Sequence, residues 1–101
     1  IFWTVYSNDE RHASISAIEN VVSRYGDIID FKFFSDISLT MAIEIEDSKI
    51  DALYNELATA IKIDKFENLN SISKKERIVY LNITFTKGTG NLIVEIPSVP
   101  G

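Results

Sequence analysis

Histidine is the residue type that exchanges protons most readily near neutral pH, and the chain has one, His12. A general base or a metal site could use it. The sequence has no cysteine and no second histidine, so a metal ion would have to be held by carboxylates. A surface position at the start of a helix explains His12 more simply. We therefore expect no catalytic residue, no metal ligand and no cofactor.

A glycine-containing stretch near the C-terminus has the composition of an anion-binding loop. Residues 87–91 read K-G-T-G-N, and glycines let backbone N–H groups converge on a phosphate. The stretch lies between two expected strands, however, so no helix N-terminus adds its dipole. The sequence favours a hairpin turn, because glycine supplies the positive φ that such turns need.

Two charged clusters have an ordinary interpretation beside a binding one. Glu44 and Glu46 share one face of an expected strand, and Asp47 precedes an expected helix, where acidic residues are common. Solvated acids are favoured over a cation site. Residues 74–77 read K-K-E-R, and the acid inside this basic run favours a solvated turn over an anion contact.

A polar segment and nearby aromatic residues are the strongest candidates for a binding site. The polar segment lies between an expected strand and an expected helix, and aromatic residues of the expected sheet could line an apolar pocket at an interface. Aromatic residues in a small sheet usually pack, so core packing or a plain dimer contact is favoured over a pocket for Trp3, Tyr6 and Phe34. The predicted ligand-binding residues are Ser7, Asn8, Asp9, Tyr6 and Phe34.

Composition limits the classes of function. The chain has 101 residues, 46% of them hydrophobic and 25% charged, which is typical of one folded domain. Its net charge of −5 opposes binding to a polyphosphate backbone, so nucleic acid is not an expected partner. No apolar run approaches the roughly 20 residues that span a bilayer, and no signal peptide is apparent. The absence of cysteine fits a cytoplasmic location.

Alternating residues predict the strands of a sheet. Residues 38–46 read S-L-T-M-A-I-E-I-E, the clearest half-buried strand in the sequence. Residues 28–34 should pair with them as a hairpin, with Ile29, Phe31 and Phe33 on one side and Phe34 on the other. Residues 1–6 and 78–85 alternate in the same way, and residues 92–96 are the expected hairpin partner of the latter.

Helical periodicity predicts two helices between these strands. The first should span residues 9–25, with Gly26 ending it in the left-handed conformation. The second should begin at Asp47 and Ser48, with Asp51 close to a capping-box position, and should bury Ile50, Leu53, Leu57 and Ile61. Residues 62–77 suit neither period and predict an irregular segment, with a short edge strand or a helical turn.

The order β-α-β-β-α-β predicts an α+β fold. We expect a ferredoxin-like two-layer sandwich, in which both helices cover one face of an antiparallel sheet and a C-terminal hairpin extends it. Right-handed crossovers would place the first and third strands side by side in the centre. The domain would divide into a core at residues 1–62, an irregular connection at 63–77 and a hairpin at 78–97.

Over residues 1–62 the chain resembles the ACT domains, a family of small regulatory modules. The features that carry the resemblance are the polar loop at residues 7–10, the apolar residues of the helix, the exit Y-G-D-I-I and the strand S-L-T-M-A-I-E-I. The resemblance implies side-by-side dimers that bind small ligands, often amino acids, at subunit interfaces near the first strand-to-helix loop.

These observations lead to three hypotheses. The first is a non-catalytic, dimeric regulatory domain that binds an amino-acid-like molecule at its subunit interface. The second is an interaction or oligomerisation module without a ligand, favoured because the loop S-N-D-E-R-H lacks a glycine that would let backbone approach a ligand. The third is a small dimeric enzyme in which His12, Tyr6 or Tyr80 acts in a cleft. Fold alone does not choose among them.

Overall fold

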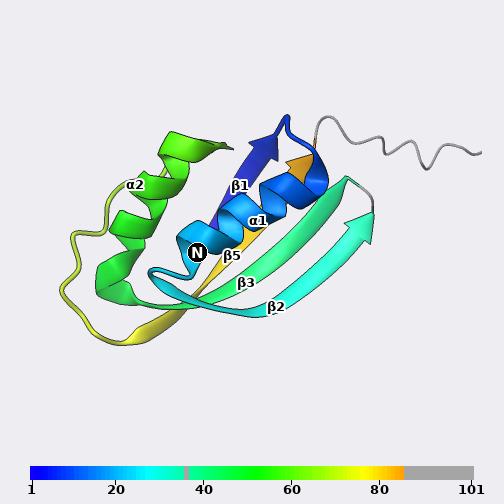
Figure 1. Ribbon diagram of the computed structural model, residues 1–101. Helices are drawn as coiled ribbons and strands as arrows, with labels where there is room; N and C mark the ends of the chain where they lie inside the picture. Colours follow the sequence, from blue (N-terminus) through cyan, green and yellow to red (C-terminus); the bar gives the residue numbers. More distant parts are fainter. Residues whose placement is uncertain (36, 86–101) are drawn as a thin grey trace, which may run out of the picture.

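The computed structural model describes residues 1–35 and 37–85, which form one five-stranded sheet and two helices (Figure 1). The elements are β1 (Phe2–Ser7), α1 (Arg11–Val22), β2 (Gly26–Ser35), β3 (Ser38–Glu46), a short 3-10 helix η1 (Asp47–Lys49), α2 (Ile50–Ala60), β4 (Lys62–Ile63) and β5 (Glu76–Phe85). The α+β class is confirmed. The loop at residues 87–91 and the expected strand at 92–96 lie outside the described residues.

The strand order is β2-β3-β5-β1-β4, which differs from the expected one. β5 lies between β3 and β1, antiparallel to the former and parallel to the latter, so the sheet is mixed. The expectation that the first and third strands are neighbours, within a purely antiparallel sheet, was wrong. The physical reason is that β5 is long and apolar enough on one face to fill the centre of the sheet, with nine of its residues paired to β3.

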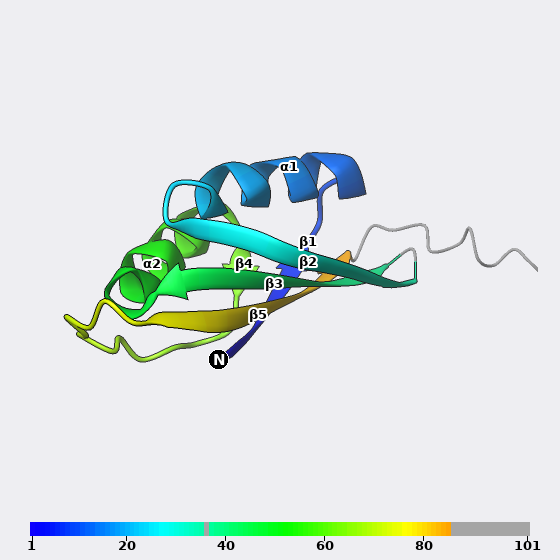
Figure 2. The same ribbon diagram turned by 90° about the horizontal axis from the view of Figure 1, so that it is seen from below.

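Both helices pack on the same face of this sheet (Figure 2). A single hydrophobic core joins them to the inward residues of β1, β3 and β5. The strand residues of this core are Trp3, Val5, Leu39, Met41, Ile43, Ile45, Val79, Leu81, Ile83 and Phe85. The alternation predicted for residues 38–46 and 78–85 is confirmed, because the inward residues of both strands are buried. Within residues 1–35 and 37–85, no helix covers the opposite face of the sheet.

The sheet ends at β2, where the predicted alternation fails at one residue. Ile28 pairs with Ile43 and Asp30 with Ala42, so Ile29 is the extra residue of a β-bulge. Ile28 therefore packs against the core, while Ile29 is 52% exposed. The strict alternation predicted through Ile29, Phe31 and Phe33 is interrupted at Ile29, because a bulge changes the register that a period of two assumes.

Helix α1 is shorter than predicted at both ends. Its N-cap is Glu10, whose carboxylate accepts hydrogen bonds from the backbone N–H groups of His12 and Ala13 at 3.1 Å each. Those two bonds lower the pKa of Glu10 below its ordinary value. The helix ends at Val22, and Gly26 does not cap it. Gly26 instead begins β2, where a Cβ would lie 2.6 Å from the carbonyl oxygen of Glu44, so the missing side chain lets β2 lie against β3.

The second helix begins differently from the expected capping box. Residues 47–49 form η1, and the Ser48 hydroxyl donates to the Glu46 carboxylate rather than capping the helix. The Asp51 carboxylate turns outward and accepts hydrogen bonds from the N–H groups of Leu69 and Asn70, both at 2.8 Å. The buried stripe of α2 is confirmed at Ile50, Leu53 and Leu57. Asp51 therefore fastens the irregular connection at residues 64–75 to the helix.

No helix of the described part of the chain is long and apolar enough to cross a membrane.

Candidate functional site

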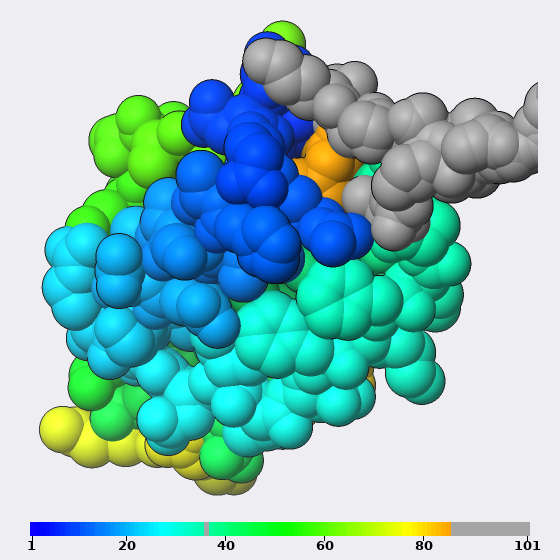
Figure 3. All heavy atoms as spheres, turned by 45° about the vertical axis from the view of Figure 1, so that its right-hand side comes forward, coloured from blue at the N-terminus to red at the C-terminus, as the bar shows by residue number. Residues whose placement is uncertain are grey.

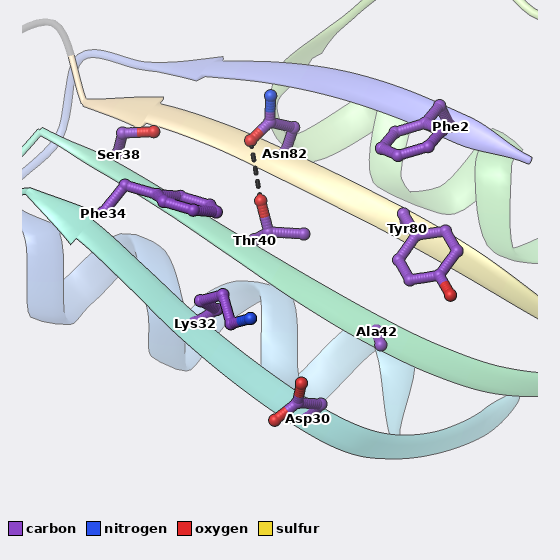
Figure 4. A pocket seen from close by; sticks show the side chains of 9 residues that line it. All are labelled: Phe2, Asp30, Lys32, Phe34, Ser38, Thr40, Ala42, Tyr80 and Asn82. Carbon is purple, nitrogen blue, oxygen red and sulfur yellow. Dashed lines mark hydrogen bonds between the residues drawn. The ribbon is translucent and has the colours of Figure 1, made fainter.

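A groove runs across the face of the sheet that the helices leave uncovered (Figure 4). It is an open trough with a volume of about 470 Å³. The residues that line it come from four strands: Phe2, Asp30, Lys32, Phe34, Ser38, Thr40, Ala42, Tyr80 and Asn82. They lie together because each is the outward residue of its strand. β5 contributes Tyr80 and Asn82 to the groove, and its pairing with β1 places Phe2 beside Tyr80.

Aromatic rings form the two ends of this groove. The rings of Phe2 and Tyr80 are stacked with centroids 5.1 Å apart at one end. Phe34 extends over the opposite end (Figure 4). Their exposed fractions are 70% for Phe2, 38% for Tyr80 and 63% for Phe34. Exposed aromatic rings at both ends of a concave surface make the groove a candidate contact site.

The middle of the groove is polar. The hydroxyl of Thr40 donates a hydrogen bond to the side-chain oxygen of Asn82, 2.9 Å away. This bond orients the Asn82 amide so that its nitrogen points away from Thr40 (Figure 4). Asp30 and Lys32 add opposite charges on the β2 side. The groove therefore offers a hydrogen-bond donor, a cation and an anion beside aromatic surface.

Four of the five predicted ligand-binding residues line a different and smaller hollow. Tyr6, Ser7, Asn8 and Asp9 lie opposite residues 60–62, around a hollow of about 240 Å³. The Ser7 hydroxyl is buried there and hydrogen-bonds with the buried Ser14 hydroxyl, and it also accepts from the N–H of Asp9 at 3.2 Å. Ser7 therefore holds β1 to α1.

Phe34, the fifth predicted residue, lies in the sheet-face groove instead. Of the two roles considered for Trp3, packing in the core is confirmed and lining a pocket is not. Trp3 points to the helix side, is 1% exposed, and packs edge-on against Tyr54 and Phe66. Neighbouring residues of β1 point to opposite faces of the sheet. Trp3 is therefore buried under the helices, and Phe2 lies exposed on the other face.

The alternation of residues 38–46 and 78–85 already places Thr40, Tyr80 and Asn82 on outward faces. Sequence reasoning missed them as a group, because only the pairing of β5 with β3 brings Asn82 opposite Thr40. Lys32 and Asp30 carry no such signal, since charged outward residues are common on strands.

The other chemical candidates remain isolated. His12 lies exposed in the first turn of α1. Arg77 forms an ion pair with Asp47 at 2.9 Å, and a hydrogen bond from Ser71 together with this contact lowers the pKa of Asp47. In residues 1–35 and 37–85 no group of three or more histidine, cysteine or carboxylate side chains could hold a metal ion.

No family model, no curated protein and no solved structure matches the chain.

Proposed function

We propose that the chain is a non-catalytic, dimeric regulatory domain that binds an amino-acid-like small molecule in the sheet-face groove. The observation that supports this proposal is the combination of aromatic surface with both signs of charge in one trough. Sites for small ligands are mostly apolar concave surfaces with a few polar groups that fix orientation. The proposal rests on the α+β fold and not on the ferredoxin-like strand order, because β5 lies between β1 and β3.

An amino acid with an apolar side chain suits the groups in the groove. Its carboxylate would meet the Lys32 ammonium, and its ammonium would meet the Asp30 carboxylate. Residues two apart on a strand are separated by about 7 Å, so both charges lie within reach of one small molecule. The apolar side chain would lie against the stacked rings of Phe2 and Tyr80.

The loop hollow at Tyr6, Ser7, Asn8 and Asp9 is the weaker position for this ligand. Its volume is about half that of the groove, at about 240 Å³ against about 470 Å³. The Ser7 hydroxyl is already engaged by Ser14 and Asp9. The proposal therefore keeps Phe34 from the predicted ligand-binding residues and moves the charged contacts to Asp30 and Lys32 of β2.

Two tyrosines provide a matched test of the two positions. Tyr80 lines the groove and Tyr6 lines the loop hollow, and they are 38% and 46% exposed. A ligand at a hundred times its dissociation constant stabilises by about 2.7 kcal/mol, which should raise the melting temperature by about ten degrees or more. We expect such a shift from one or more amino acids in a thermal-shift screen, its loss in Tyr80→Ala, and its retention in Tyr6→Ala. The reverse pattern would place the ligand at the loop.

A second candidate function is an assembly module without a small ligand. Its support is the edge strand β2, where Phe31, Phe33 and Phe34 are 36%, 56% and 63% exposed. A flat screen against amino acids and common metabolites would reject the ligand proposal and leave this function in its place.

A further inference from the structure

β2 is the outer strand at one end of the sheet, and its aromatic residues lie at the surface. Within the part of the chain that the structure describes, β3 is the only strand that pairs with it. The cyan atoms of β2 form an exposed surface beside the blue atoms of α1 (Figure 3). A strand of ten residues with an unpaired edge presents N–H and C=O groups that another strand can pair with.

The middle of β2 is regular, and bulges limit it on both sides. Pairing with β3 shifts between Ile28 and Asp30 and again between Phe33 and Ser35, so residues 30–33 form an uninterrupted strand segment. Bulges at both ends would confine any edge pairing to this short segment. A second strand that pairs there would therefore be limited to this segment, and its register would be defined.

The charges of this segment are complementary to a second copy of the same segment. Asp30 and Lys32 point to the uncovered face of the sheet and lie on either side of Phe31. A two-fold axis perpendicular to the sheet places two copies of β2 antiparallel. If that axis passes at Phe31, Asp30 lies opposite Lys32 of the partner subunit, and Lys32 lies opposite Asp30 of the partner subunit.

Neighbouring registers lack this complementarity. Moving the axis to Asp30 would place two carboxylates opposite each other, and moving it to Lys32 would place two ammonium groups opposite each other. Like charges directly opposite are destabilising, whereas opposite charges stabilise a cross-strand pair. The sequence D-F-K therefore selects the register centred on Phe31.

Apolar contacts on the helix side of the sheet support the same register. Phe31 and Phe33 are stacked with centroids 6.4 Å apart, and the Arg11 guanidinium lies 5.8 Å from the centroid of Phe33. In the register centred on Phe31, the two Phe31 rings face each other and each is a diagonal neighbour of the partner's Phe33. Aromatic side chains reach such diagonal neighbours, so association would cover rings that one subunit leaves exposed.

We propose that the chain forms a two-fold symmetric dimer by antiparallel pairing of β2 with β2, centred on Phe31, which joins the two sheets into one. The partner is a second copy of this chain. Asp30 and Lys32 also line the groove, so the dimer and the ligand proposal share these two charges, whereas cross-linking at Phe31 tests the dimer without changing them.

Charge exchange at Asp30 and Lys32 tests the partner and the register together. We expect light scattering to show a dimer that dissociates on dilution. Asp30→Lys alone and Lys32→Asp alone should each raise the dissociation constant by about tenfold or more, because each creates two like-charged pairs. The double variant D30K/K32D should restore the dimer, and an equimolar mixture of the two single variants should form a heterodimer.

Cysteine cross-linking tests the register independently, because the natural chain has no cysteine. Phe31→Cys places two thiols opposite each other at the axis, and mild oxidation should link them. Phe33→Cys is the matched control, since its two copies would lie about 13 Å apart along the strands. We expect disulfide-linked dimers from the first variant and none from the second.

Three results would overturn the inference. A wild-type chain that stays monomeric at every concentration would remove the dimer, whatever else occupies the edge of β2. The interface would lie elsewhere if neither single charge change altered the dissociation constant of the dimer. A mixture of the two single variants that stays monomeric would have the same meaning. Equal cross-linking at residues 31 and 33 would reject the register. None of these results bears on the thermal-shift screen, so the ligand proposal fails or stands separately.

Discussion

Two aromatic clusters lie towards opposite edges of the sheet. One packs into the core, and the other is exposed at the surface. Towards β4, Trp3 packs against Tyr54 and Phe66 with ring centroids 5.3 Å and 5.1 Å away, and Trp3 is 1% exposed. On β2, Phe31 and Phe33 are stacked but remain 36% and 56% exposed. Similar side chains thus serve the core at one end and form a surface at the other. The difference teaches that burial here depends on what covers each edge.

The β4 edge is covered by the chain's own connection. β4 has only two residues, and Asp64 extends its pairing with β1 through two hydrogen bonds to Thr4. The Asp64 N–H donates to the Thr4 carbonyl, and the Thr4 N–H donates to the Asp64 carboxylate, both at 3.0 Å. The Tyr54 hydroxyl donates to the Asp64 carbonyl at 2.6 Å. Short, covered edges resist pairing with other chains, whereas the longer β2 has no such cover among the described residues.

Removing one aromatic ring from each cluster in turn should give the largest difference in the free energy of unfolding. Trp3→Ala creates a cavity in the core and should lower the free energy of unfolding by about 3–5 kcal/mol. Phe33→Ala removes a half-exposed ring and should cost less than about 1 kcal/mol. Urea denaturation at concentrations where the chain is monomeric measures both. Similar losses from the two variants would show that the β2 cluster contributes to the core as much as Trp3 does.

Gly26→Ala tests whether close backbone contact with β3 holds β2 to the sheet. The aromatic rings of β2 are not buried, so they contribute less to holding it there. The added Cβ would lie 2.6 Å from the Glu44 carbonyl oxygen and 3.0 Å from the Cβ of Ile45. Backbone must move to relieve the first contact, so we expect a loss of about 1–3 kcal/mol in the free energy of unfolding. Amide hydrogen exchange should locate the change at the start of β2. A stable variant with unchanged exchange would mean that β2 tolerates displacement there.

Asp51→Ala tests the cover of the opposite edge. The carboxylate holds the N–H groups of Leu69 and Asn70, and Asn70 has a positive φ of 52°. Losing these exposed hydrogen bonds should cost about 1 kcal/mol and increase proteolysis within residues 64–75. Asp51→Asn, which keeps one acceptor oxygen, should lose less. Unchanged proteolysis in Asp51→Ala would show that the connection is held by Phe66 and its neighbours alone.

The sequence predicted those parts of the fold that depend on local pattern. The period of two in residues 38–46 and 78–85 assigned buried and outward faces correctly, and the stripe of α2 was correct at Ile50, Leu53 and Leu57. Strand order was not predictable in this way, because insertion of β5 between β1 and β3 depends on pairings of residues far apart in the chain. A bulge at Ile29 was equally invisible to a periodic rule.

The candidate site was predicted only where one strand face sufficed. Phe34 was placed on the outward side of its strand and lies in the groove. Ser7 was chosen for a short polar side chain in a loop, but such residues also join elements of the fold, as its hydrogen bond with Ser14 does. Tyr80 and Asn82 join the groove only through the position of β5.

The smallest expected effect is a pH dependence of the connection at residues 64–75, where it reaches the ends of β3 and β5. A hydrogen bond from Ser71, and then the contact with Arg77, lower the pKa of Asp47 below its ordinary value in the folded chain. A carboxyl group with a lowered pKa contributes stability that is complete above its unfolded pKa and is lost as pH falls through the folded pKa. Acidification should therefore loosen the connection that carries Ser71, while β2 keeps its pairing with β3.

Backbone amides beside this carboxylate report the loosening directly. The N–H groups of Asp47 and Ser48 donate to the carbonyls of Lys75 and Ser73 at 2.8 Å and 3.0 Å. Their protection from hydrogen exchange, corrected for intrinsic rates, should fall with pH through the acidic range, and that of residues 30–33 should not. Asp47→Asn should have the lower protection near neutral pH and should match the wild type at the acid end of the range, because an amide cannot ionise. If protection depended on pH in the same way in the wild type and in Asp47→Asn, a group other than Asp47 would control the stability of these hydrogen bonds.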